Sequence, residues 1–462
     1  MPYTPPAHGW RTFWLLWVSQ SVSVLGSALT LFGITIWLIQ SLYPRPEQKP
    51  ALAFALCAVS LTFALPAVLL APLAGAWADR YDRRRIMLLM DAASGIFSLV
   101  LAQLIFAHAL SLWILLLLLL LHGLASVFHF AAFDTAYVML IPPRQLLRAN
   151  GMMQSVSALA GIIAPGIAAG IIALPALARQ QVIGGSVLHW LGHLHDGLPL
   201  LILLDAVSFI LSAVTLYYLS IPSPLRLDLL TEDGLRQKSI WEDIKGGAFY
   251  IWHRRPLLWL LGTYLGINFA SAPAVMLYPL LVKFNLHDDW TARRMSMETA
   301  LAVLTTFSGL GGLAGALIIS AWGGLKRRRI YAVLIALCSM GLLSVFLGLS
   351  TRLYVAASII IFVSFTGPIA QSHTQAIWQT QTPHELQGRV FSFRRLIAQC
   401  TWPLGNLLGG IIGGLFNPGH MIAILGAFIT VVCLVQLCNP HLLHVDDKER
   451  MDRIALERVV AG

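Results

Sequence analysis

The chain has 462 residues, of which 57% are hydrophobic and only 11% are charged, and its formal net charge is +10. Soluble domains carry about 25% charged residues. This composition therefore excludes a globular protein whose surface is polar enough for solubility in water. The positive charge does not indicate nucleic-acid binding, because the basic residues lie in short loops between apolar segments, as they do in membrane proteins.

Twelve apolar segments follow one another along the chain, and a helix needs about 20 mainly apolar residues to cross a bilayer. The first six lie near 12–40, 52–77, 86–107, 111–139, 149–176 and 198–220. The second six lie near 256–284, 299–322, 330–350, 353–379, 394–416 and 419–439. The pattern predicts an all-α membrane protein with twelve transmembrane helices.

The longest polar stretch, residues 221–255, separates the two sets and contains six Lys or Arg and five acidic residues. We predict an N-terminal six-helix half at 1–220, a cytoplasmic linker at 221–255, a C-terminal six-helix half at 256–440 and a cytoplasmic tail at 441–462. With the N-terminus inside, 24 of the 31 Lys and Arg lie on the inner side, as the positive-inside rule requires. Both termini are therefore expected in the cytoplasm, and the multi-pass chain in the cell (inner) membrane.

The loop between the second and third segments carries the sharpest motif. It reads Gly75-Ala-Trp-Ala-Asp79-Arg80-Tyr-Asp82-Arg83-Arg84-Arg85. A related basic run, Lys326 to Arg329, follows the eighth segment at a shift of about 240 residues, and Pro143–Arg148 and Pro383–Arg389 correspond at a similar shift. Two equivalent sites at one shift indicate duplicated halves, which is a recurrent plan of transporters.

The first of these loops resembles the signature of the major facilitator superfamily, G-x-x-x-D-R-x-G-R-R-K, with Asp82 in place of the usual glycine. That variant is familiar in the subgroup of macrolide-efflux and siderophore-exporter-like drug:proton antiporters. Further likeness lies in Arg148–Gly151 and Glu385–Ser392. The resemblance implies the major facilitator fold, with two six-helix halves, and transport by alternating access.

The resemblance also implies that this loop is an inner gate. Small Gly75 would let helices approach closely, Asp79 would accept hydrogen bonds from a neighbouring helix N-terminus, and the arginines would bond acidic groups on adjacent helices. The predicted gate residues are Gly75, Asp79, Arg80, Asp82, Arg83 and Arg84, with Asp91 and Asp134 as the nearest acidic partners. In the alternative, the arginines only set the topology and contact lipid phosphates. Gly323 and Gly324 replace Asp79 and Arg80 in the second copy, so the gate is expected to be asymmetric.

The fifth segment resembles the helix-packing motif of exporters in this superfamily, G-x8-G-x3-G-P-x2-G-G. Gly151 and Pro165 match it, and Ala160, Ala164, Ala168 and Ala169 stand where glycine is usual. Small residues and a proline allow tight contact and a bend. The motif favours export over import, although ordinary close packing gives the same pattern.

Ionisable residues within spans are rare and costly, so each is a functional candidate. Asp205 lies about seven residues into the sixth segment and is the candidate for proton coupling; the alternative is a structural carboxylate that is bonded to a neighbouring helix. His122 and His129 lie seven residues apart on one face of the fourth segment. They are a possible proton relay, with hydrogen-bonded packing as the simpler interpretation.

Uncharged polar residues are candidates for lining a central cavity: Gln20, Ser21, Asn268, Gln371 and Asn406. A cavity with few fixed charges favours bulky amphipathic molecules. In the outer loop, His189, His193, His195 and Asp196 have a spacing that suits zinc or copper, but an interfacial helix explains them equally, and we predict neither a metal nor another cofactor.

The motifs HExxH, G-x-S-x-G and Walker G-x4-G-K-[ST] are absent from the sequence, so hydrolysis and ATP use lack their usual residues. We predict a monomeric secondary transporter that exports a small amphipathic molecule, such as a drug, a macrolide or a siderophore-like compound, in exchange for protons. A lysolipid flippase or an importer of the same fold is the alternative, and an intramembrane enzyme is a distant one. No nucleic acid is expected as a partner.

Overall fold

The structure is a computed structural model that describes residues 8–142, 145–179, 192, 194, 196–221, 248–325, 327–382 and 387–446. Every regular element within these ranges is helical. The long helices are α1 (Gly9–Trp37), α2 (Lys49–Arg80), α3 (Arg83–Phe106), α4 (Leu112–Leu140), α5 (Leu146–Arg179), α7 (Leu198–Tyr218), α9 (Arg255–Met276), α12 (Met297–Trp322), α13 (Arg329–Leu349), α14 (Leu353–Gln381), α15 (Gln387–Leu415) and α16 (Pro418–Leu437).

Short elements complete the list: π-helical turns at Leu38–Leu42 and Leu281–Asn285, a 3-10 turn at Pro46–Gln48, and α10 (Tyr278–Leu280), α11 (His287–Ala292) and α17 (Pro440–Leu443). Eleven helical segments of the described chain are long and apolar enough to cross a membrane. The predicted eleventh span falls on α15, a helix of 29 residues that is not among those eleven. The fold class predicted from hydropathy is confirmed.

The described helices form two compact units. The N-terminal unit comprises Met1–Gln48, Ala58–Glu232 and Ser296–Thr306, and the C-terminal unit comprises Lys49–Cys57, Asp233–Met295 and Phe307–Gly462. The predicted linker therefore contributes to both, and its central residues 222–247 lie outside the described part of the chain. Tyr250 and Ile251, near the end of the predicted linker, are buried in the core of the C-terminal unit.

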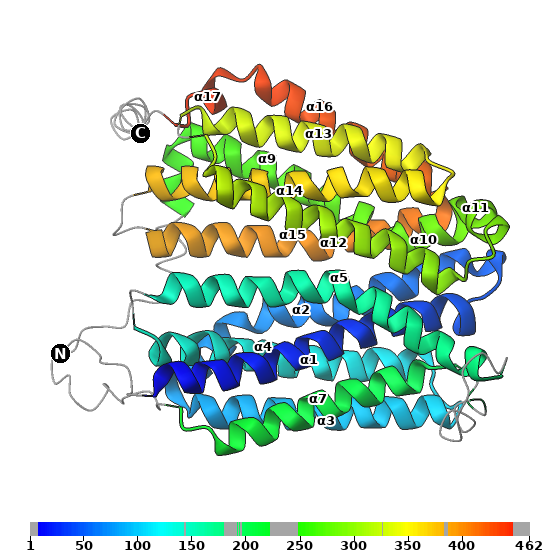
Figure 1. Ribbon diagram of the computed structural model, residues 1–462. Coiled ribbons are helices and arrows are strands. Elements are labelled where there is room, and N and C mark those ends of the chain that lie inside the picture. Colours follow the sequence, from blue (N-terminus) through cyan, green and yellow to red (C-terminus); the bar gives the residue numbers. More distant parts are fainter. Residues whose placement is uncertain are drawn as a thin grey trace. The chain divides into compact units, whose positions relative to one another are not determined.

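Within the N-terminal unit, α7 packs against both α1 and α3, α4 packs on α3, and α5 packs on α1 (Figure 1). Small residues allow these close approaches. A Cβ atom at Gly123 of α4 would lie only 2.4 Å from the Thr62 carbonyl oxygen of α2, and one at Gly26 of α1 would lie 2.9 Å from Asp205 Oδ1 of α7. Glycine at these two positions therefore sets the distance between the helices.

The C-terminal unit is built in the same way: α13 packs against α14 and α16, and α9 packs against α15 and α16.

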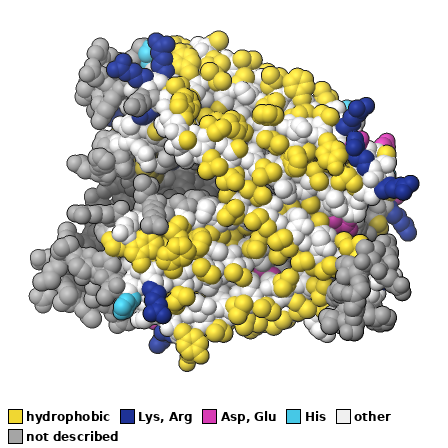
Figure 2. Space-filling model, viewed as in Figure 1, with side chains coloured by type: hydrophobic (Ala, Val, Ile, Leu, Met, Phe, Trp, Pro, Cys, Tyr) yellow, Lys and Arg dark blue, Asp and Glu magenta, His cyan; other side chains and the backbone are white. Residues whose placement is uncertain are grey.

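Large apolar side chains are exposed on the helices of both units, such as Leu69, Trp113 and Val435. Figure 2 shows hydrophobic side chains spread over the visible face, with Lys and Arg gathered near the ends of the helices. Such a surface suits contact with lipid tails along the helices and with water at their ends.

Candidate functional site

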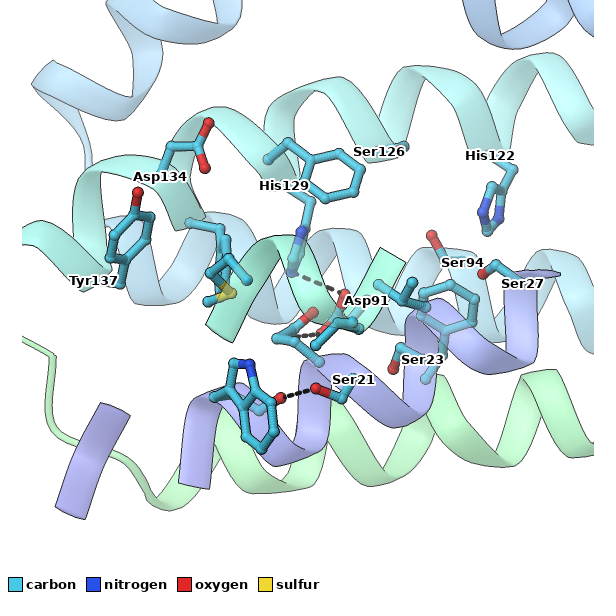
Figure 3. Close-up of a pocket in the computed structure, with 18 of the residues that line it drawn as sticks. Ser21, Ser23, Ser27, Asp91, Ser94, His122, Ser126, His129, Asp134 and Tyr137 are labelled. Atoms are coloured by element: carbon cyan, nitrogen blue, oxygen red, sulfur yellow. Dashed lines mark hydrogen bonds and ion pairs between the residues drawn. The ribbon is translucent and has the colours of Figure 1, made fainter. Parts of the chain in front are cut away.

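The helices of the N-terminal unit line an open cavity of about 680 Å³, which is within the range of small-molecule sites. Its wall combines hydroxyl, imidazole and carboxyl groups with aromatic rings (Figure 3). The lining residues are Trp17, Gln20, Ser21, Ser23, Val24, Ser27, Phe63, Asp91, Ser94, His122, Ser126, His129, Phe130, Phe133, Asp134, Tyr137, Met153, Val156 and Phe209. Two of the predicted cavity residues, Gln20 and Ser21, are among the residues that line this cavity of the N-terminal unit.

Asp91 on α3 lies at the centre of a buried cluster from four helices. Its Oδ2 atom accepts hydrogen bonds from Ser212 Oγ at 2.6 Å and from Gln20 Nε2 at 3.1 Å. His129 Nε2 on α4 lies 3.2 Å from Asp91 Oδ1, and Figure 3 shows the imidazole aimed at the carboxylate. A buried charge needs partners of this kind, so the cluster explains how a carboxylate that is 2% exposed is tolerated inside the unit.

Asp205 on α7 lines a second, smaller cavity of about 200 Å³. The two cavities share the lining residues Ser27, Phe63 and His122. Asp205 is also only 2% exposed. Its carboxylate accepts hydrogen bonds from Ser98 Oγ at 2.9 Å and from Ser27 Oγ at 3.3 Å. The sequence analysis singled out Asp205 but not these serines. Their position within apolar segments is the feature of the sequence that could have identified them.

The expected partners of the gate arginines are wrong in two respects. Asp91 does not pair with them: it accepts hydrogen bonds from Gln20 and Ser212, and it lies 3.2 Å from His129 Nε2. Arg84 donates instead to the carbonyl oxygens of Leu216 and Tyr217, where the last turn of α7 leaves them without helical partners. A cation at a helix C-terminus is favourable for the same reason.

Arg83 is buried and donates to the backbone carbonyls of Ala78 and Thr135 and to the sulfur of Met139. It ties the start of α3 to the end of α2 and to α4. Arg80 is exposed. Asp134 is exposed at the wall of the 680 Å³ cavity. The side chain of Asp79 lies outside the described part of the structure.

Asp82 is the N-cap of α3, where its side chain accepts from the backbone N–H groups of Arg84 at 3.0 Å and of Arg85 at 3.4 Å. Its φ of −62° is open to any residue, which explains why the usual glycine is dispensable. Gly75 does not serve close packing here, because a Cβ atom on it would meet no described heavy atom within 4 Å.

The second copy of the loop is held differently. Gly323 and Gly324 have φ of +76° and +72°, a conformation that side chains disfavour. His373 Nε2 accepts a hydrogen bond from the Leu325 N–H at 2.9 Å. Asp446, in the predicted tail, accepts from the Ile330 N–H at 3.4 Å at the start of α13. Sequence reasoning found neither His373 nor Asp446, because both contacts join distant parts of the chain.

The remaining candidates separate into three groups. Asn268 and Gln371 line a cavity of about 130 Å³ in the C-terminal unit. Asn406 is buried, and it is not among the residues that line the three cavities described here. In α5, Ala164 and Pro165 are buried, as close packing requires, whereas the surroundings of Gly151 lie outside the described part.

The loop histidines His189, His193 and His195 also lie outside the described residues. Among the residues that the structure describes, no three or more His, Cys, Asp or Glu side chains gather where they would hold a metal ion. The N-terminal cavity is lined by carboxyl, imidazole, amide and hydroxyl groups, which bind polar groups and exchange protons.

Many long apolar helices, with a cavity of small-molecule size among those of the N-terminal unit, indicate a multi-pass membrane protein and are typical of transporters. The family model described as Major Facilitator Superfamily matches residues 16–399. The chain belongs to this superfamily, so it is a transporter and not an enzyme.

The chain is similar to the following three proteins. Macrolide efflux protein A of Streptococcus pyogenes is 22% identical over 435 residues, which cover 93% of this chain and 96% of that protein. Macrolide efflux protein A of Enterococcus faecalis is 23% identical over 352 residues, which cover 75% of this chain and 97% of that protein. The crystal structure of a mutant of the nucleoside transporter NupG has a TM-score of 0.66 at 11% identity and covers 92% of this chain and 99% of that chain.

Proposed function

We propose that the protein is a proton-coupled exporter that moves a small amphipathic molecule across the cell inner membrane by alternating access. The observation that carries the proposal is the presence of two buried carboxylates, Asp91 and Asp205, beside two cavities of one unit that share lining residues. Carboxylates inside membrane proteins commonly mark proton or substrate pathways. No metal or cofactor is needed in this scheme, and a monomer with cytoplasmic termini suffices.

The substrate class follows from the wall of the larger cavity. Trp17, Phe133 and Tyr137 present aromatic surface, and Asp134 adds a carboxyl group at the same wall. Aromatic rings together with the carboxyl groups of Asp134 and Asp91 suit an apolar molecule that carries an amine. The similarity to two macrolide efflux proteins supports export of such a compound.

Transport by the purified protein in proteoliposomes tests the proposal. With an imposed pH gradient, we expect uphill movement of radiolabelled erythromycin, and collapse of the gradient should abolish the accumulation. A panel of a cationic dye, a siderophore and a lysolipid compares the other substrate classes. Gradient-independent flux would identify a facilitator, and lysolipid flipping without erythromycin transport would favour the flippase.

Asp205→Asn tests the coupling role directly. We expect the variant to bind erythromycin and exchange it at equal pH, but to lose uphill accumulation, because an amide cannot release a proton. The matched control is Asn406→Asp, which adds a carboxyl group at a buried site that does not line the cavity. Unchanged uphill transport by Asp205→Asn would exclude this residue from coupling.

A further inference from the structure

Four helices of the N-terminal unit carry polar residues at one common spacing. The pairs are Gln20 and Ser27 on α1, Asp91 and Ser98 on α3, His129 and His122 on α4, and Ser212 and Asp205 on α7. Seven residues are close to two turns, so the members of each pair lie on one helix face about 10.5 Å apart. The pairs form two layers, which we call the Asp91 layer (Gln20, Asp91, His129, Ser212) and the Asp205 layer (Ser27, Ser98, His122, Asp205).

The two layers have nearly the same composition, with carboxylate and serine exchanged between two helices. In the Asp91 layer α3 supplies the carboxylate and α7 the serine, and Ser212 Oγ donates to Asp91 at 2.6 Å. In the Asp205 layer α7 supplies the carboxylate and α3 the serine, and Ser98 Oγ donates to Asp205 at 2.9 Å. Each layer also contains one imidazole from α4.

A third layer lies halfway between them and consists of serines alone: Ser23, Ser94, Ser126 and Ser208, one from each of the same four helices. Ser23 Oγ donates to the Ser208 carbonyl at 3.1 Å, and Ser208 Oγ donates to the Asp205 carbonyl at 2.7 Å. Ser94 and Ser126 line the larger cavity, and Figure 3 shows Ser126 between His129 and His122 on α4.

The two cavities share lining residues, and together they touch all three layers. The larger cavity is lined by members of the Asp91 layer and the serine layer and by Ser27 and His122 of the Asp205 layer. The smaller cavity is also lined by Ser27 and His122, together with Ser98 and Asp205. A volume of about 680 Å³ holds on the order of twenty waters at about 30 Å³ each. Hydroxyl groups that both donate and accept are suited to order such water.

We propose that these three layers form a proton path through the N-terminal unit, with Asp205 and the Asp91–His129 pair as its two stations and the serine layer as the connection. This inference rests on the proposed proton coupling and names its route. In one passage the Asp205 carboxyl group releases its proton to water at the serine layer, and a proton from that water chain binds Asp91 or His129. Asp134 and Tyr137 are the other titratable groups on the cavity wall.

Ser126 offers the sharpest test, because it lines the cavity and is only partly buried. Ser126→Val and Ser126→Thr add side chains of similar shape, but only threonine keeps the hydroxyl group. Both variants are reconstituted in proteoliposomes and measured in two assays with radiolabelled erythromycin: exchange at equal pH and uphill accumulation driven by a pH gradient. Asp91→Asn is measured alongside them.

Because Ser126 and Asp91 line the larger cavity, uphill accumulation by each variant is compared with that variant's own exchange at equal pH. Relative to exchange, Ser126→Val should lower uphill accumulation about tenfold, which corresponds to about 1.4 kcal/mol, whereas Ser126→Thr should retain it. Asp91→Asn should lower it at least as far, because an amide cannot exchange a proton. Uphill accumulation that survives in Ser126→Val and Asp91→Asn overturns the path. Loss of exchange in all three variants also overturns it, since the layers would then serve packing. Absence of uphill transport in the wild type refutes the proposed function itself. The wild-type measurement therefore distinguishes a failure of the proposed function from a failure of the proton path.

Discussion

Gly26 on α1 is the position where the structure makes the most quantitative prediction. A Cβ atom there would lie 2.7 Å from Ser208 Oγ, 2.9 Å from Asp205 Oδ1 and 3.1 Å from Asp205 Cα. The serine hydroxyl can rotate away, but the Cα atom belongs to the backbone of α7. The variant Gly26→Ala must therefore push α1 away from α7 by several tenths of an ångström.

The cost follows from two opposing terms. Overpacking a close contact costs about 1–3 kcal/mol, and replacing glycine by alanine within a helix returns about 0.5–1 kcal/mol. Gly166→Ala in α5 is the matched control, because a Cβ atom there meets no described heavy atom within 4 Å. The control variant gains only the stability that alanine adds within a helix. Gly26→Ala should therefore be less stable than Gly166→Ala by the overpacking cost of about 1–3 kcal/mol.

The measurement is the thermal unfolding of both variants in detergent, with size-exclusion chromatography to quantify the protein that stays folded after heating. We expect Gly166→Ala to melt at or above the wild-type temperature and Gly26→Ala to melt several degrees lower. Gly26→Ala should also lose uphill transport, because the Ser27–Asp205 hydrogen bond of 3.3 Å lies at the same contact. Equal melting temperatures for the two variants would refute the packing of α1 on α7 described here.

Two further predictions concern the helix starts. Asp82→Ala removes the N-cap of α3 and should cost about 1 kcal/mol of stability, whereas Asp82→Gly should cost only a few tenths; equal melting temperatures in detergent would contradict the capping role. Burial raises the pKa of Asp446, so its carboxyl group favours the folded state at low pH, and this contribution is lost as the pH rises through the folded pKa. Asp446→Asn should therefore show a smaller loss of thermal stability from about pH 4 upward than the wild type does, and parallel pH profiles would contradict this.

The fold was predictable because it depends on signals within single segments. Predicted spans such as 330–350 and 198–220 coincide with α13 and α7 to within a few residues, since length and apolar composition decide a membrane helix. Asp205 was identifiable for a similar reason: a lone carboxylate in an apolar run is conspicuous in any sequence.

The partners within the site were not predictable in the same way. Asp91 lies nine residues after Asp82, which suggested the gate, but rotation of α3 aims it at Gln20 and His129 inside the unit. Arg84 finds backbone carbonyls at the end of α7, and sequence patterns do not show carbonyl groups that a helix end leaves free. Asp446 meets α13 only through tertiary packing.

The layered arrangement was partly visible in the sequence. His122 and His129 lie seven residues apart on one segment, and polar residues with the same spacing occur on three others. Periodicity alone does not show that the four faces converge, because that depends on the orientation of each helix about its axis. The packing of α1, α3, α4 and α7 supplies this information.

Proton movement driven by a substrate gradient tests the central claim most directly. Proteoliposomes that contain the wild-type protein and a trapped pH-sensitive dye are given an erythromycin gradient with no initial pH difference. We predict that downhill erythromycin flux produces a pH change in the lumen, and that Asp205→Asn passes erythromycin without that change. Erythromycin flux through the wild type with no change in luminal pH would contradict proton-coupled export.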